Sequence, residues 1–431
     1  MPEFHYLRIV KALTMKTRYF LLSLLIPALL FCCAPKQNNT PADETPDVQI
    51  PEGYEEPVFE RNPDDPADEV LTELPPQINN GDQVLVTRNY VDKFLAEVSY
   101  PDHSYTETHI LEYEGGYNNP DATDYPVFNA DKPALYTIRW TADQGAGDLV
   151  LTLKDGNWEQ AIKVAAGKDN QIITNLRPNA SYTYEVKANS GKVMTSGSFT
   201  TTGRLHQVFF DWNVRNARDL GGWKTYDGKT VKYRKIYRGG RLEGSTMSPE
   251  GRQAVLAEGI KAQLELRGSS DMLEWTALGG QYAFCNPGID NGGTSMLTKY
   301  KAKTKECFEF VVQCMREDKP VYFHCSLGRD RTGTLAALLL GVLGVREGDI
   351  SQEYELSYFA PRGWSIAYSE SSKVFKNTRL TEYKGVAELF WRRGKKSDGT
   401  YERFDKCVEN YLLEIGVEQK DIDDFRALML E

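Results

Sequence analysis

The stretch KPVYFHCSLGRDRTGT, residues 319–334, joins a short apolar run to a glycine-containing loop and then to a second apolar run. Residues 321–323 have the pattern of a β-strand, and residues 335–343 have that of a helix. A strand, a tight loop and a helix in this order point several backbone N–H groups and a helix N-terminus at one place, where an anion binds. The stretch therefore predicts a phosphate-binding loop.

Cys325 opens this loop, and the same electrostatic field is expected to favour its thiolate at neutral pH. Arg331 follows six residues later and can bind a phosphate through two N–H groups. The next residue, Thr332, has a hydroxyl that can reach back toward the sulfur. A nucleophile, an anion cradle and a cationic clamp together indicate phosphoryl transfer through a cysteine.

The pattern His-Cys-x5-Arg-Thr at 324–332 resembles the signature of the protein tyrosine phosphatase superfamily. The full run 324–333 is similar to a bacterial branch of tyrosine and dual-specificity phosphatases, in which an aspartate directly precedes the arginine. Further segments resemble the same branch: NARDLGG at 216–222, YRGGRL at 237–242, IKAQLELR at 260–267 and the C-terminal end from 416. One departure is Glu265, which stands where that branch usually has aspartate.

The resemblance implies a hydrolase that forms a cysteinyl-phosphate on Cys325. In this hypothesis Arg331 clamps the phosphate, Thr332 assists the sulfur as a leaving group, and His324 orients the loop. The backbone of the loop would surround the phosphate oxygens; its residues are Ser326, Leu327, Gly328, Arg329, Asp330 and Arg331.

Two aspartates are candidates for the general acid that protonates the leaving oxygen. Asp330 lies inside the loop, where the bacterial branch has its catalytic aspartate. Asp290 lies in a loop rich in glycine after the preceding strand, where other phosphatases of the superfamily have theirs. The sequence favours Asp330 and leaves Asp290 as the alternative.

Three hypotheses about the function remain open. The first is a phosphotyrosine protein, with dual specificity as an extension. The second is a phosphoinositide or inositol phosphate, because Arg329 adds a second cation beside Arg331. The third is an inactive surface protein that binds phosphoryl groups, although the intact Cys325, Arg331 and Thr332 argue against it.

Composition excludes several other classes. The chain has 431 residues, enough for two or three domains, and its formal net charge of −10 argues against a nucleic-acid-binding protein. The seven cysteines and five histidines have no zinc-ligand spacing. We therefore predict no metal and no cofactor, and the sequence gives no oligomeric state.

Residues 1–33 have the pattern of a signal peptide of the lipoprotein type. A basic segment at 15–18 precedes an apolar run at 19–31, which is too short to span a bilayer comfortably. Cys33 is the expected lipidation site, so the protein is expected to be exported and to sit at the cell envelope, on the periplasmic or surface side, with a lipid anchor in the membrane. A cleaved secretory signal and an uncleaved anchor are the alternatives.

Residues 34–80 are expected to form an acidic, proline-rich linker, with 8 Pro and 12 Asp/Glu between residues 41 and 80. Residues 81–202 have short apolar runs separated by turn signals, which predicts an all-β sandwich. The run LRPNASYTYEV at 176–186 resembles the tyrosine corner of a fibronectin type III-like, immunoglobulin-like domain, with Tyr182 as the corner residue.

Residues 203–431 are expected to form the phosphatase domain. Strand-like and helical runs alternate through it, which indicates an α/β fold with a central sheet flanked by helices. In such a sheet the ligand binds at the carboxyl ends of the strands, which is where the loop at 325–331 would lie.

Overall fold

The computed structural model describes residues 73–87, 89–97, 100–103, 132–211, 214–242, 248–268, 276–359, 366–369, 374–377 and 380–431. All of these belong to one compact unit, residues 46–431. The predicted signal peptide, Cys33 and most of the predicted linker lie outside the described residues. Within the described residues, no helix is long and apolar enough to span a membrane.

The N-terminal part of the described chain is built mainly of strands. One sheet has the order β1-β7-β6-β3-β4, and β2 pairs with β5. The elements are β1 (Gln83–Leu85), α1 (Asn89–Glu97), β2 (Tyr136–Arg139), β3 (Leu149–Asp155), β4 (Trp158–Val164), β5 (Asn170–Ile173), β6 (Ser181–Ala188) and β7 (Val193–Thr202).

Alternation of side chains decides which face of these strands is buried. In β6 the buried residues are Tyr182, Tyr184, Val186 and Ala188, and the residues between them point away from the core. The predicted Asp-Gly turn joins β3 to β4, and Gly156 has a φ of 58°, a left-handed conformation that glycine adopts without strain. The end of the predicted linker also belongs here, because Ile78 is buried in this core.

The second part of the chain is the expected α/β domain. Its five-stranded sheet has the order β11-β10-β12-β9-β8, with β8 antiparallel and the other four parallel. The strands are β8 (Arg218–Asp219), β9 (Ile236–Gly239), β10 (Ala262–Glu265), β11 (Ala283–Cys285) and β12 (Val321–His324); a separate hairpin is formed by β13 (Ile366–Ser369) and β14 (Val374–Asn377). The helices are α3 (Pro249–Ala257), α4 (Gly293–Lys299), α5 (Lys301–Arg316), α6 (Asp330–Leu343), α7 (Glu347–Glu355), α8 (Leu380–Trp391), α9 (Phe404–Glu414) and α10 (Gln419–Met429), with short 3-10 turns η2 (Leu356–Phe359) and η3 (Arg392–Gly394).

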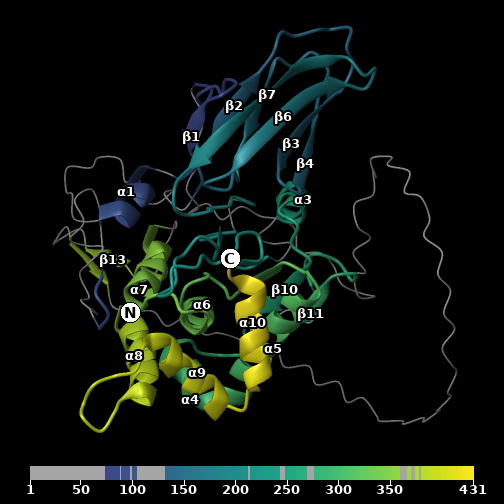
Figure 1. Ribbon diagram of the computed structural model, residues 1–431. Helices are drawn as coiled ribbons and strands as arrows, with labels where there is room; N and C mark the ends of the chain where they lie inside the picture. The colour runs from purple at the N-terminus through teal and green to yellow at the C-terminus, as the bar shows by residue number, and fades with distance from the viewer. Residues whose placement is uncertain are drawn as a thin grey trace, which may run out of the picture. The chain divides into compact units, whose positions relative to one another are not determined.

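Strand β12 lies in the middle of this sheet and is buried on both faces. Val321 and Phe323 pack into the larger apolar cluster with α5, α6, α9 and α10, whereas Tyr322 packs into a second cluster with α3 on the other face. Helix α6 is buried from Thr332 to Leu343, and Figure 1 shows it at the centre of the domain. Burial of this kind stabilises by roughly 1.5–3 kcal/mol per large apolar side chain, so the loop before α6 has a rigid base.

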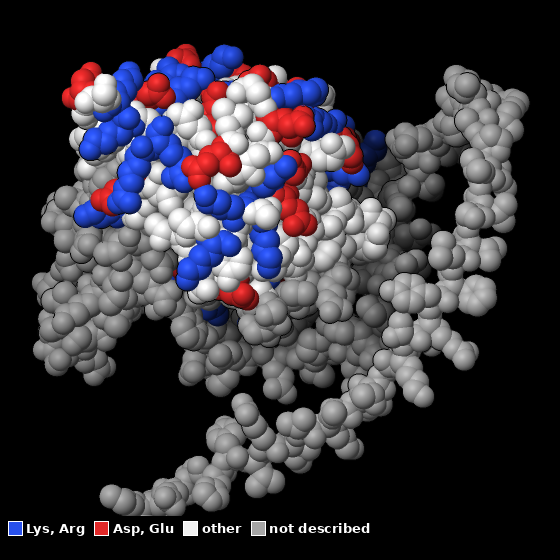
Figure 2. Space-filling view, turned by 90° about the horizontal axis from the view of Figure 1, so that it is seen from below, with Lys and Arg blue, Asp and Glu red and all other residues white. Residues whose placement is uncertain are grey.

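Figure 2 shows that Lys and Arg are mixed with Asp and Glu over the face of the described residues that it presents. Surface ion pairs fit this pattern: Arg316 of α5 contacts both Asp421 and Asp424 of α10. Such exposed pairs contribute little to stability. The visible face carries no extended patch of a single sign.

Helix α1 interrupts the predicted all-β region. Val91, Phe94 and Leu95 of α1 are buried, but they are absent from the apolar core of strands β1 to β7. Gln352 of α7 donates to the Phe94 carbonyl oxygen, and Arg204 donates to that of Leu95. This helix therefore packs against the α/β domain, although it precedes strands β2 to β7 in the chain.

Candidate active site

The predicted phosphate loop lies at the carboxyl end of β12, between the neighbouring strands β9 and β10. Cys325 is the first residue after the strand and is 3% exposed. Helix α6 begins five residues later at Asp330. The strand, the loop and the helix N-terminus thus follow in the order that anion binding requires.

Gly328 gives the loop its tight shape. Its φ is 72°, and a Cβ built there would lie 2.4 Å from the carbonyl carbon of Gly239 in β9. No other residue fits this position, because both the backbone conformation and the space exclude a side chain. The loop therefore lies directly against the end of β9.

Arg331 extends from the first turn of α6 toward the loop at 289–293. Its Nη1 donates to the carbonyl oxygen of Ile289 at 3.0 Å, and its Nη2 lies 3.5 Å from Oγ of Ser326. The guanidinium is thus held between the phosphate loop and the neighbouring loop. This is a suitable place for a cation that binds a phosphate above Cys325.

His324 lies beneath the loop rather than beside the sulfur. Its Nε2 is 2.8 Å from Nε2 of Gln263, and its Nδ1 is 3.3 Å from the Cys325 carbonyl oxygen. Glu265 is also close, 3.7 Å from Nδ1. Burial would raise the pKa of Glu265, but His324 and Arg267 outweigh it and hold this pKa below its ordinary value. The glutamate that departs from the family pattern is therefore a buried anion that supports the strand ends.

The two candidate acids, Asp330 and Asp290, line the same cavity. It has a volume of about 600 Å3 and is also lined by Arg331, Lys299 and Gly385, with the loop from Asn291 to Ser295. The Asp330 carboxylate accepts hydrogen bonds from Nε and Nη2 of Arg329 at 2.9 and 3.0 Å. Asp290 accepts from the hydroxyl of Tyr300 at 3.1 Å.

Arg329 lies differently from what the sequence suggested, whereas the role of Thr332 is untested. Arg329 is buried and turned toward the Asp330 carboxylate, so it is an internal ion-pair partner rather than a second cation facing a substrate. The hydroxyl of Thr332 is buried and has no hydrogen-bond partner within the described residues. Its donation to the Cys325 sulfur stays a prediction.

A buried ion cluster supports the loop from below, and sequence reasoning did not find its central residue. Glu353 of α7 contacts Arg218 of β8 at 2.8 Å and Arg238 of β9 at 2.7 Å, and all three side chains are at most 3% exposed. Arg238 also donates to the carbonyl oxygen of Gly328 at 2.5 Å. The cluster therefore fixes the backbone of the phosphate loop.

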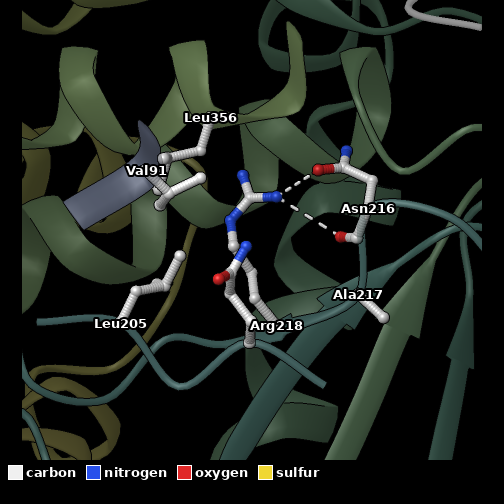
Figure 3. A pocket seen from close by; sticks show the side chains of 7 residues that line it. Val91, Leu205, Asn216, Ala217, Arg218 and Leu356 are labelled. Atoms are coloured by element: carbon white, nitrogen blue, oxygen red, sulfur yellow. Dashed lines mark hydrogen bonds between the residues drawn. The ribbon is translucent and has the colours of Figure 1, made fainter. Parts of the chain in front are cut away.

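Asn216 completes this support from the NARDLGG segment. Its Nδ2 donates to the Gly328 carbonyl oxygen at 2.8 Å, while its own oxygens accept from Arg218, as Figure 3 shows. The φ of Asn216 is 59°, a left-handed conformation that asparagine tolerates better than most residues. The arginines of this segment were predictable as site elements, but Glu353 lies in a helix with no motif that marks it.

The site combines four features. A central parallel strand ends in a buried cysteine, a tight glycine loop follows, a helix N-terminus faces the loop, and an arginine is directed at it. These features define the class of α/β proteins with a phosphate-binding loop. A model described as the tyrosine phosphatase family matches residues 212–431, more than half of the chain. The chain belongs to the tyrosine phosphatase family and is a phosphatase.

Two sequences and one solved structure are similar to parts of this chain. A Cupriavidus necator protein, named as a tyrosine-protein phosphatase, is 27% identical to this chain over 250 residues. The match covers 50% of this chain and 86% of that protein. A tyrosine-protein phosphatase of Nostoc commune is 28% identical over 124 residues, 26% of this chain and 40% of that protein. The crystal structure of P. aeruginosa TpbA covers 43% of this chain and 89% of its own, with a TM-score of 0.27 and 14% identity.

Proposed function

We propose that the protein hydrolyses phosphotyrosine in proteins, with dual specificity as an extension, through a cysteinyl-phosphate on Cys325. The observation that carries the proposal is the meeting of Cys325, the N-terminus of α6 and the Arg331 guanidinium at one loop. A dianionic phosphoryl group is the ligand that these groups bind together.

In the first step the Cys325 thiolate attacks phosphorus, and the bond from phosphorus to the substrate oxygen breaks. The electron pair of that bond goes to the leaving oxygen, which takes a proton from an aspartic acid. In the second step the same aspartate takes a proton from water, and the water oxygen attacks phosphorus. The sulfur then leaves as thiolate, and inorganic phosphate is released.

The ion pair of Asp330 favours Asp290 as this acid. Asp330 is an ion-paired carboxylate, and it would have to leave Arg329 before it could carry a proton to the leaving oxygen. Asp290 contacts a neutral hydroxyl and lines the same cavity as Arg331. Activity falls on the alkaline side of the pH–rate profile as the general acid loses its proton. This alkaline limb should therefore disappear in Asp290→Asn and persist in Asp330→Asn.

A phosphoinositide or inositol phosphate is the second candidate substrate, and the lining of the cavity supports it. Within the described residues this lining consists of polar side chains and glycines, with Lys299 at its edge. A hydroxyl-rich ring with further phosphates would find hydrogen-bond donors there. The sequence supported this candidate through Arg329, which is now seen to pair with Asp330. The lining of the cavity is the support that remains.

The test is release of phosphate by the full chain in the presence of EDTA, compared with the Cys325→Ser variant. A phosphotyrosine peptide, a phosphoserine peptide and a phosphoinositide are measured in parallel. We expect turnover by the wild type alone, with the phosphotyrosine peptide as the best substrate. Equal activity in Cys325→Ser, or none in either protein, would contradict the proposal.

We also infer that the phosphatase is exported and anchored by a lipid on Cys33, and that residues 81–202 form a fibronectin-like module beside it. The inferred export rests on the sequence of residues 1–33. The module is supported by the hydroxyl of Tyr182, which accepts from the backbone N–H of Arg177 at 2.8 Å, a contact typical of a tyrosine corner. Labelling with radioactive palmitate should occur in the wild type and be lost in Cys33→Ala.

A further inference from the structure

Helix α7 has an unusual composition for its position. Its sequence, EGDISQEYE, is polar over most of its length, yet eight of its nine residues are buried: Glu347, Gly348, Ile350, Ser351, Gln352, Glu353, Tyr354 and Glu355. Buried polar groups are costly unless they have partners. The partners of this helix therefore show what it does in the fold.

Glu353 faces the phosphate loop through its two arginines. Three other polar residues of α7, Glu347, Gln352 and Glu355, contact a segment that precedes strand β2 in the chain. This segment consists of α1 and residues 100–103. We call this segment the N-terminal clamp. Figure 3 shows Val91 of α1 and Leu356 near the Arg218 guanidinium, on the side away from Asn216. The clamp thus lies close to the same arginine that Glu353 binds.

Residues 100–103 contact α7 at both of its ends. The hydroxyl of Tyr100 donates to Glu355 at 2.6 Å, and the backbone N–H of His103 donates to Glu347 at 2.9 Å. A Cβ at Gly348 would lie 1.8 Å from the Tyr100 carbonyl oxygen, so the two backbones are in direct contact. The His103 ring also stacks on Trp391 of α8, with centroids 4.0 Å apart.

We propose that the N-terminal clamp is a positioning element of the active site, which holds α7 so that Glu353, through Arg238, fixes the Gly328 carbonyl of the phosphate loop. The segment between β1 and β2 is then part of the phosphatase, and residues 203–431 alone are an incomplete enzyme. This inference rests on the proposed function, because it concerns the efficiency of that same loop.

The test uses the full chain with the substitution Tyr100→Phe, which removes one hydroxyl and keeps the ring. Tyr136→Phe is the matched control, because the Tyr136 hydroxyl donates to the Leu85 carbonyl oxygen inside the sandwich. We expect kcat of Tyr100→Phe to fall roughly three- to tenfold, since one hydrogen bond to a buried carboxyl is lost, with KM changed less than kcat. Inhibition by inorganic vanadate, which reports on the loop without turnover, should weaken in parallel.

A clamp that only stabilised the fold would lower the melting temperature of Tyr100→Phe and leave kcat and vanadate inhibition of the folded enzyme unchanged, and this result would overturn the proposal. The double variant Tyr100→Phe with Glu355→Leu adds a second criterion. If Tyr100 and Glu355 act through their contact, kcat of the double variant should be no lower than that of Glu355→Leu alone. Additive losses of kcat would overturn the proposal that Tyr100 acts through Glu355.

Failure of the proposed function gives a different result. In that case the wild type shows no turnover that depends on Cys325. If the wild type depends on Cys325 and Tyr100→Phe matches Tyr136→Phe in kcat and vanadate inhibition, only the role of the clamp is contradicted.

Discussion

Two clusters in this molecule share the same chemistry, a carboxylate bound by two arginines, but they have different surroundings. Glu353 with Arg218 and Arg238 is fully buried and touches the phosphate loop. Asp155 at the end of β3 binds Arg177 and Arg234, which are partly exposed, and Arg234 also donates to the Tyr182 hydroxyl. The first cluster supports the predicted phosphate loop, and the second joins the N-terminal β-rich part to the α/β domain.

This difference shows that the role of a buried charge depends on what its partners touch. Removal of one member of a buried ion cluster is costly because the remaining charges lose compensation. At Glu353 that loss is transmitted to Gly328 and therefore to the phosphate. At Asp155 it is transmitted to β6 and to Trp158, whose ring lies 3.8 Å from the Arg234 guanidinium.

The largest effect is expected from Glu353→Ala. It leaves two buried guanidinium groups without their carboxylate, which should lower the free energy of unfolding by about 3–5 kcal/mol. Activity of the folded fraction should fall at least about 100-fold. Chemical denaturation and phosphate release at a temperature where the variant is folded measure the two effects separately. Loss of stability with normal kcat would remove the link between the cluster and catalysis.

Asp155→Ala should affect stability without affecting chemistry. Because Arg177 and Arg234 are partly exposed and can recover water contacts, we expect a loss of about 1–3 kcal/mol in the free energy of unfolding. The kinetic constants of the folded variant should equal those of the wild type. A fall in kcat similar to that of Glu353→Ala would mean that the two clusters do not differ in role.

Asn216→Gly is expected to have an intermediate effect on activity. Glycine accepts the left-handed backbone at this position, so the substitution removes the amide donor to the Gly328 carbonyl with little strain. It also removes the side-chain oxygen that accepts from Arg218, which adds a cost in stability. A lost hydrogen bond of about 0.5–1.5 kcal/mol predicts a decrease in kcat of roughly three- to tenfold. The corresponding control is Asn179→Gly, a left-handed asparagine in the sandwich, which should leave kcat unchanged.

The smallest effect is expected from Glu355→Gln and appears only in the pH dependence of stability. Burial raises the pKa of Glu355 from 4.5 to about 8, and the Tyr100 hydroxyl opposes this shift. The folded protein therefore holds this proton to higher pH than the unfolded chain does. The resulting stability is complete below about pH 4.5 and is lost as pH rises through about 8.

Glutamine mimics the neutral carboxyl, so the variant should match the wild type at pH 5 and melt a few degrees higher at pH 9. Thermal unfolding across this range is the measurement. A variant that is less stable than the wild type at pH 9 would show that the folded protein favours the ionised form of Glu355, which would contradict a raised pKa.

Much of the site followed from the sequence because it is local. Cys325, Gly328 and Arg331 belong to one strand, loop and helix, so their spacing alone places them together. The segments 216–222 and 237–242 were also recognisable, since glycines and arginines occur there in a fixed order. Strand alternation likewise located Tyr182 and Val186 on the buried face of β6.

Other parts depended on contacts between distant residues. Glu353 lies 115 residues from Arg238, and nothing in EGDISQEYE distinguishes its glutamates from those of an exposed helix. Tyr100 and Glu355 are 255 residues apart, and the sequence assigned the segment around Tyr100 to the sandwich. The pairing of Arg329 with Asp330 was not predictable either, because neighbouring side chains can point in different directions at the start of a helix.

The central claim is that phosphate passes through the sulfur of Cys325. The most direct test is rapid acid quenching of the full chain during turnover of a phosphotyrosine peptide, followed by mass spectrometry of the peptide that contains Cys325. The account predicts a phosphorylated cysteine at this position in the wild type and none in Cys325→Ser, which should also be inactive. Turnover without any label on Cys325, together with activity in Cys325→Ser, would contradict it.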